Sequence, residues 1–228
     1  MGHYFAARYH KTAVTLPYFI PFLPPVGTMG AVIRMKAPLK NKRVLLDIGA
    51  AGPLAGMVFA IPILLYGLYT SDLGPVIFGQ PIEGNSILYY AAKFAVFGRF
   101  LPDATHDVYL NQVAWAGWVG LLVTALNLMP VGQLDGGHIT YALWGEKSNQ
   151  FYLPVMVALA ALSIISLVTG GLLTWIFWLV LLFLFGRMRA EPLDDVTPLD
   201  KRRKAVAVLC LVVFVLVFVP LPFYVLVQ

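Results

Sequence analysis

Four ionisable side chains stand within or beside apolar stretches and could do chemistry there: His3, His10, Asp135 and His138. Ionisable groups at membrane depth are costly to bury, so each is a candidate for function. His3 and His10 are seven residues apart and share a helix face, but two helical turns separate them by roughly 10 Å. Because a zinc ligand lies about 2 Å from its ion, one metal cannot bind both. We interpret His10, next to Lys11, as a side chain at the membrane interface.

Asp135 lies in the stretch NLMPVGQLDGGH, residues 127–138, where three glycines and a proline interrupt an apolar helix. Such a break can turn a carboxylate toward a cavity, where it is protonated or holds a cation. An Asp at a helix end, satisfied by local amides, is the equal alternative. His138 could be a ligand, could orient a ligand, or could be a buried histidine with ordinary hydrogen bonds. Asn127 could stabilise an oxyanion or cap the break.

The composition indicates that these residues are positioned by membrane helices. Hydrophobic residues make up 60% of the 228 residues and charged residues only 12%, whereas soluble domains have about 25% charged residues. We expect an α-helical polytopic membrane protein with about five full spans, a partial N-terminal helix and a small interfacial β-hairpin. The expected spans are residues 44–69, 112–129 with a broken continuation toward 144, 151–168, 172–185 and 205–227. Residues 1–15 are helix-compatible but too short to cross alone.

The placement of Lys and Arg supports this topology. With five crossings, 14 of the 16 basic residues fall on one side, and only Lys93 and Arg99 lie opposite, in a long outside loop over residues 70–111. The positive-inside rule places the basic side in the cytoplasm, so we expect a multi-pass protein of the cell membrane with its active site nearer that side. Because the basic residues cluster beside apolar spans, the net charge of +5 does not indicate a nucleic-acid partner. The single cysteine, Cys210, excludes an intramolecular disulfide.

The segment LPYFIPFLPPVGTMGAVIRM, residues 16–35, is apolar but contains four prolines, which forbid a regular helix. Its second half is strand-like, and non-helical backbone at membrane depth must pack against protein or line a cavity. We expect an interfacial hairpin tucked into the helices; a connector lying on the membrane surface is the alternative.

Two features of the first span receive structural interpretations. Gly52 and Gly56 are four residues apart, and small residues at this spacing let membrane helices approach closely, so we assign them to packing. Asp47 stands near the expected helix start and close to Arg43. We expect it to cap the helix or to form an ion pair.

The pattern N-x-x-P-x-x-x-L-D-G, intact at residues 127–136, resembles the second active-site motif of the site-2 proteases, which are intramembrane zinc metalloproteases. The first residues, MGHYFAARYH, resemble the latter part of that family's H-E-x-x-H motif and the residues after it, with Met1 and Gly2 at the x positions and His3 as the second zinc histidine. The resemblance covers roughly residues 1–145, which we assign to a metalloprotease core. Residues 146–228 form C-terminal membrane spans.

The resemblance implies a zinc enzyme that cleaves peptide bonds of membrane-spanning proteins, so the expected partners are such substrates and the lipid bilayer. It implies His3 and Asp135 as zinc ligands and Asn127 as a catalytic residue, with His138 as a possible further member. An extended substrate would pair with the hairpin as an added strand. The residues expected to bind it are Gly30, Ala31, Val32 and Ile33. The oligomeric state is open.

The sequence departs from the family pattern at one place: the first His and the Glu of H-E-x-x-H would stand directly before Met1. We therefore expect the chain as written to be inactive and the natural product to begin upstream. A non-catalytic membrane scaffold or binding protein that keeps the fold is the alternative. An ion-coupled transporter, with Asp135 binding a cation, is disfavoured because the sequence shows no internal repeat.

Overall fold

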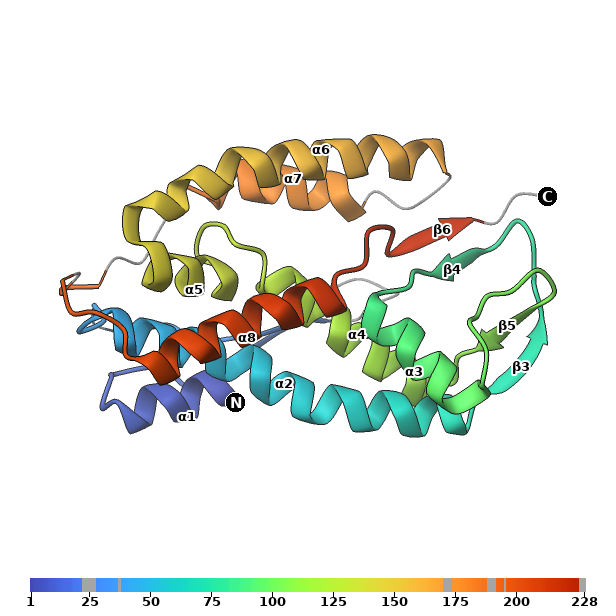
Figure 1. Cartoon of the computed structure of the whole chain (residues 1–228), viewed down its shortest axis with the longest axis horizontal. Helices are drawn as coiled ribbons and strands as arrows, with labels where there is room; N and C mark the ends of the chain where they lie inside the picture. Colours follow the sequence, from blue (N-terminus) through green and yellow to red (C-terminus); the bar gives the residue numbers. More distant parts are fainter. Residues whose placement is uncertain (22–27, 37, 170–173, 188–191, 195, 226–228) are drawn as a thin grey trace.

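The computed structural model describes the chain except residues 22–27, 37, 170–173, 188–191, 195 and 226–228, and is mainly helical (Figure 1). The helices are α1 (Gly2–Tyr9), α2 (Lys42–Tyr69), α3 (Ile87–Phe97), α4 (Gln112–Asn127), α5 (Asp135–Trp144), α6 (Tyr152–Val168), α7 (Thr174–Phe185) and α8 (Lys201–Val217), with a 3-10 segment, Gly145–Phe151, between α5 and α6. The strands are β1 (Tyr18–Pro21), β2 (Thr28–Val32), β3 (Asp72–Pro75), β4 (Pro81–Glu83), β5 (His106–Tyr109) and β6 (Phe223–Val225).

Helix α2 is the element on which the others assemble, because α1, α3, α4, α5 and α8 all pack against it. The Asn41 side chain caps its start by accepting a hydrogen bond from the Val44 amide (3.1 Å). Close packing with α4 depends on glycine: a Cβ at Gly117 would lie 2.6 Å from the backbone of Leu64. The long α2 therefore forms a rigid support for the short helices beside it.

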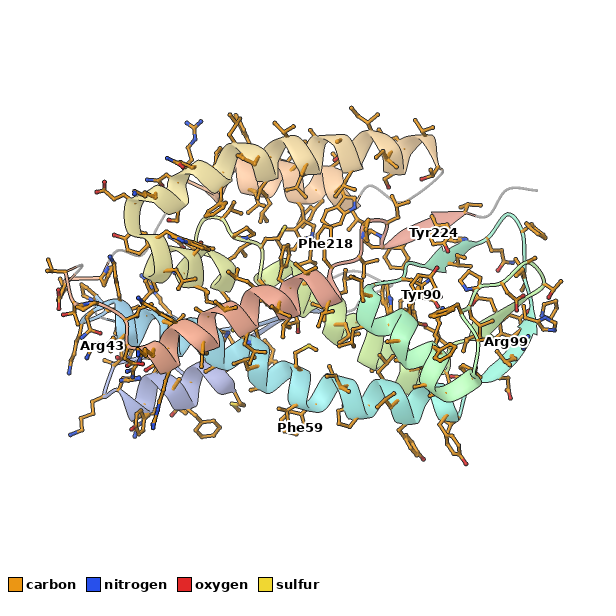
Figure 2. All side chains as sticks on the ribbon, in the orientation of Figure 1. Arg43, Phe59, Tyr90, Arg99, Phe218 and Tyr224 are labelled. Atoms are coloured by element: carbon orange, nitrogen blue, oxygen red, sulfur yellow. The ribbon has the colours of Figure 1, made fainter. Side chains whose placement is uncertain are left out.

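Within the part of the chain that the structure describes, two helical stretches are long and apolar enough to cross a membrane: residues 42–69, with mean hydropathy 2.0, and residues 135–168, with mean hydropathy 2.4. The first agrees with the predicted span at 44–69, and α4, α6 and α7 lie where apolar segments were predicted. A count of five crossings stays a prediction. Figure 2 shows Arg43 and Arg99 at opposite ends of the molecule, as the predicted division of basic residues requires.

The predicted last span, 205–227, is wrong at its C-terminal end. Helix α8 stops at Val217, and the chain continues through Pro220 and Pro222 into β6, which pairs antiparallel with β4. Proline has no amide hydrogen and cannot continue a helix, which explains the early end. The apolar residues after α8 complete a sheet instead of a span.

The predicted hairpin is present: β1 and β2 pair antiparallel, with Tyr18 opposite Val32 and Phe19 opposite Ala31. Hydrogen bonding between the two segments continues beyond the strands, where the Thr15 amide donates to the Arg34 carbonyl oxygen (3.0 Å). Part of the predicted segment, residues 22–27, lies outside the described residues. Within the described chain the sheet contains only these two strands.

The predicted outside loop, residues 70–111, contains α3 and strands β3, β4 and β5. Its centre is the wholly buried Lys93, whose Nζ lies 3.3 Å from a Glu83 carboxylate oxygen and 3.6 Å from one of Asp107. The Tyr89 hydroxyl donates to the same Glu83 oxygen (2.9 Å). This charge cluster joins α3 to β4 and β5 and forms a buried polar centre within residues 70–111.

Candidate metal site

His3 is fixed on α1 by the fit of that short helix against α2. Gly2 lets the two backbones touch, because a Cβ there would overlap the carbonyl oxygen of Ala51. The His3 Nδ1–H donates to the Ile48 carbonyl oxygen at 2.8 Å, which places a proton on Nδ1 and directs Nε2 away from the backbone of α2. A histidine held in this way presents Nε2 as a metal ligand.

Gly52 on α2 makes room for this ring. A Cβ at Gly52 would overlap the His3 imidazole, whereas a Cβ at Gly56 would meet only the Thr124 hydroxyl, at 3.6 Å. The sequence interpretation assigned both glycines to helix packing. Gly52 has a more specific role, because its missing side chain is the space that the candidate ligand occupies.

Asp135 is placed by the break between α4 and α5. Gly132 adopts a positive φ of 61°, a conformation that glycine tolerates. A Cβ at Gly136 would overlap the Leu128 carbonyl oxygen, and one at Gly137 would overlap that of Gly132. The glycines of the motif therefore let the turn fold directly under the first residues of α5, with Asp135 at the helix start.

The structure brings the two predicted zinc ligands together. Nε2 of His3 lies 3.3 Å from Oδ2 of Asp135, and their side chains are 23% and 15% exposed. Two cavities meet at this pair. The larger, about 360 Å³, lies between α2 and α4, and the smaller, about 230 Å³, is lined by Ile33 and His138; His3, Asn127 and Asp135 line both.

Imidazole nitrogen and carboxylate oxygen are both zinc donors, so this pair fits a zinc ion. Among the described residues, no group of three His, Cys, Asp or Glu side chains is arranged to hold a metal. His138 lines the smaller cavity without completing such a group. The described residues thus bring together two side chains of the types that bind zinc.

The other predicted site residues are the catalytic candidate Asn127 and the four residues predicted to bind the substrate. Asn127 is half-buried at the end of α4 and faces both cavities. Of the predicted substrate-binding residues, Ile33 lines the smaller cavity. Gly30, Ala31 and Val32 lie on β2, where the structure describes the backbone and not the side chains.

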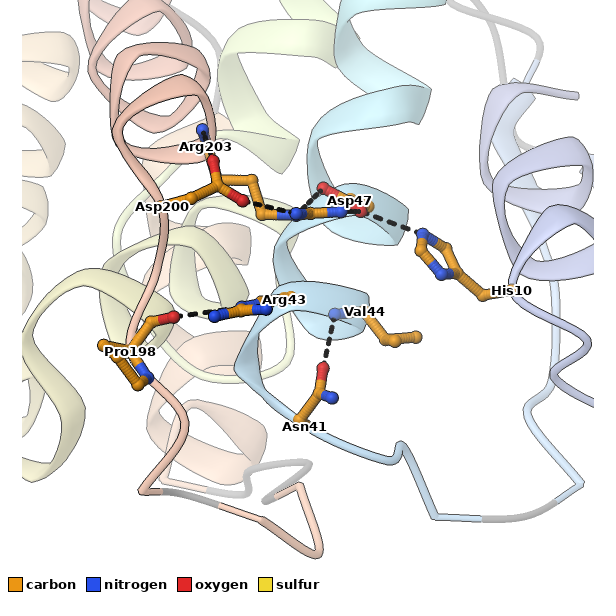
Figure 3. Close-up of polar contacts among 8 residues, drawn as sticks. All are labelled: His10, Asn41, Arg43, Val44, Asp47, Pro198, Asp200 and Arg203. Carbon is orange, nitrogen blue, oxygen red and sulfur yellow. Dashed lines mark hydrogen bonds and ion pairs between the residues drawn. The ribbon is translucent and has the colours of Figure 1, made fainter.

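The expected ion pair of Asp47 is present, but its partner is not the nearby Arg43 (Figure 3). Asp47 neither caps α2 nor pairs with Arg43, which donates instead to the Pro198 carbonyl oxygen. The Asp47 carboxylate accepts hydrogen bonds from Nε2–H of His10, at 2.8 Å, and from the guanidinium of Arg203. His10 is a largely buried partner of this carboxylate, with a 16% exposed side chain. Sequence spacing gives no signal for contacts between residues so far apart.

The sequence comparisons agree with this geometry. The profile of Peptidase family M50 matches residues 1–169. A protein of Oryza sativa subsp. indica, "Probable zinc metalloprotease EGY2, chloroplastic", is 31% identical over 98% of this chain and 40% of its own length. Its Arabidopsis thaliana counterpart is 30% identical over 98% of this chain and 39% of its own length. The chain thus spans about two fifths of these relatives. No solved structure matches.

Proposed function

Because the chain belongs to Peptidase family M50, we propose that it carries part of the active site of an intramembrane zinc metalloprotease that cleaves membrane-spanning proteins. The observation that carries the proposal is the approach of His3 Nε2 to Asp135 Oδ2, at 3.3 Å. These atoms come from helices at two separate places in the chain, and both helices pack on α2.

His3 and Asp135 would hold the zinc ion. When bound, zinc supplies Lewis-acid chemistry that activates water for attack on a peptide carbonyl. Asn127 faces both cavities beside the pair. In the proposed role, its amide donates a hydrogen bond to the carbonyl oxygen of the bond under attack, where negative charge develops.

The family motif places the remaining ligand and the general base in a His-Glu pair directly before Met1. The first His would be four residues before His3 on the same helix face, since residues i and i+4 are neighbours on a helix. The larger cavity is lined by Met1, His3 and Gly52 and so lies beside the start of α1. This location supports an added helical turn there.

The proposed substrate contact is the hairpin. Cleavage needs an extended peptide, and β2 could receive one as an added strand because only β1 pairs with it among the described residues. Ile33, the residue after β2, lines the smaller cavity beside His3 and Asp135. Proline at Ala31 or Ile33 should then reduce cleavage, and unaffected cleavage would count against this contact.

The proposed location is a membrane crossed several times, with the active site near the basic end of the molecule. Three basic residues that mark this end, Lys42, Arg43 and Arg203, lie at the starts of α2 and α8. We propose the cell membrane, with this end in the cytoplasm. Labelling single cysteines near Arg43 and Arg99 with a membrane-impermeant reagent tests the sidedness, because the two must react from opposite sides.

The activity test uses the chain with His-Glu added directly before Met1, in lipid vesicles with a membrane-spanning peptide substrate. The matched controls carry His-Gln in place of His-Glu, or His-Glu together with Asp135→Ala. We expect cleavage only with His-Glu, at a rate at least roughly 100-fold above both controls, because a general base contributes 10²–10⁴-fold. Zinc binding without cleavage would favour the non-catalytic scaffold.

A further inference from the structure

The carboxylate of Asp47 connects three helices. On one side it accepts the Nε2–H of His10, at the end of α1, at 2.8 Å. On the other it accepts two donors of Arg203, from α8: Nε at 2.9 Å to Oδ1 and Nη2 at 2.7 Å to Oδ2 (Figure 3). Two-point contacts between Arg and a carboxylate fix orientation as well as distance.

The contacts of Asp47 with His10 and Arg203 are partly buried, and a second carboxylate also binds Arg203. The side chains of His10, Asp47 and Arg203 are 16%, 25% and 29% exposed. The Nη1 group of Arg203 also donates a hydrogen bond to Oδ2 of Asp200, at 2.5 Å. A partly buried network of this kind contributes more than an isolated exposed ion pair, because water screens it less.

Helix α1 depends on such contacts for its position. In the chain as given it spans the eight residues Gly2–Tyr9, and helices in proteins gain most of their stability from tertiary packing rather than from propensity. Two side-chain hydrogen bonds join it to adjacent residues of α2: His3 to the Ile48 carbonyl and His10 to the Asp47 carboxylate. Among the described residues, removal of the second would leave the His3–Ile48 bond as the remaining side-chain hydrogen bond between the two helices, beside the packing of Ala7 against α2.

Through Arg203, Asp47 is also connected to the helix that supports Asp135. Helix α8 packs against α5, the helix that begins with Asp135. In this interface Ala207 and Cys210 are buried in one cluster with Ile139 and Ala142. One carboxylate therefore connects the helix carrying His3 with the helix that supports Asp135.

We propose that Asp47 is a positioning residue for the metal site, which holds α1 in the register that sets His3 opposite Asp135. The proposal rests on the function proposed above. Asp47 itself touches neither ligand; it acts through His10 on α1 and through Arg203 on α8.

The test measures two properties of the full 228-residue chain in detergent: hydrogen–deuterium exchange of the α1 amides, and affinity for Co²⁺, whose visible absorption reports its ligand geometry. The variants are Asp47→Ala, His10→Ala, and His10→Gln, which keeps an N–H donor. The control is Asp103→Ala, which removes the partner of Arg99 (3.3 Å) at the far end of the molecule.

We expect Asp47→Ala and His10→Ala to speed exchange in α1 at least about tenfold while α2 and α4 keep their protection. Both should weaken Co²⁺ binding by roughly 10–100-fold, as losses of residues that orient metal ligands do. His10→Gln should restore both properties toward those of the unchanged chain, and Asp103→Ala should change neither.

Unchanged α1 exchange in Asp47→Ala would overturn the proposal. Equally faster exchange in α1, α2 and α4 would also overturn it, because that pattern indicates a general loss of stability. If the unchanged chain binds no Co²⁺, the metalloprotease proposal fails, whereas the exchange comparison still shows whether Asp47 holds α1.

Discussion

His3 contacts α2 and α5 with the two nitrogens of one ring: Nδ1 donates to the Ile48 carbonyl oxygen at 2.8 Å, and Nε2 lies 3.3 Å from Oδ2 of Asp135. The first contact places a proton on Nδ1, and the second turns Nε2 toward a carboxylate. A metal site shared by two helices needs this division of roles, because a ring with both nitrogens engaged by backbone could not bind an ion.

The first prediction concerns the glycine next to Asp135. Gly136→Ala should destabilise the protein by about 1–3 kcal/mol, as overpacking does, and should lower metal affinity, because its Cβ would overlap the Leu128 carbonyl oxygen. Gly56→Ala is the matched control, since its Cβ would make an ordinary contact at 3.6 Å. Thermal unfolding and Co²⁺ titration of both variants check this. Equal effects of the two substitutions would contradict it.

The second prediction concerns Asn127. In the chain extended by His-Glu, Asn127→Ala should lower kcat about 10²–10³-fold, the loss typical of one oxyanion donor, with zinc content unchanged. Measurement of kcat and KM separates this from a binding effect. If zinc content or thermal stability falls in parallel with kcat, Asn127 only caps the end of α4.

The third prediction concerns the buried charge cluster of Lys93, Glu83 and Asp107. Lys93→Met should destabilise the fold by roughly 3–5 kcal/mol, because Glu83 and Asp107 would stay buried without their cation. Burial already raises the pKa of Glu83. Adding Glu83→Gln should recover part of the loss by removing one carboxylate. Detergent-based unfolding measures both, with exposed Lys201→Met as the control; no recovery in the double variant would contradict this account.

The fourth prediction is a pH dependence. Backbone hydrogen bonds from Thr105 and His106 lower the pKa of Asp103 to about 2. A lowered carboxyl pKa stabilises the folded state fully above the ordinary value and loses this effect as the pH falls through about 2. Asp103→Asn should therefore lower the Tm near pH 7 and have little effect near pH 2. A Tm difference of the same size at both pH values would contradict the assignment.

Local sequence patterns predicted the elements that depend on local chemistry. The apolar run at 44–69 predicted α2, the prolines at 16–25 excluded a helix before β2, and the motif around Asp135 predicted a break between two helices. The approach of His3 to Asp135 was expected from the family resemblance, since residues at such a separation have no pattern of their own. The resemblance also explains why Asn127 was assigned to the same site.

Contacts between distant segments were not predictable in this way. Asp47 forms an ion pair with Arg203, whereas the nearby Arg43 donates to the Pro198 carbonyl oxygen. The reason is that the packing of α8 on α2 places Arg203 beside Asp47. Likewise, the C-terminal apolar residues looked like the end of a span, but they pair with β4. In both cases the tertiary arrangement determines the outcome, and a single sequence does not carry that information.

The central claim, that one ion is shared by His3 and Asp135, is tested most directly by zinc affinity in a double-mutant cycle. We expect His3→Ala and Asp135→Ala each to weaken zinc binding by at least roughly 100-fold, and the double variant to lose little more, because both ligands serve the same ion. The matched control is Asp72→Ala, which removes an exposed carboxylate on β3, outside both cavities. Zinc binding that survives either single substitution at the affinity of the unchanged chain would contradict the account.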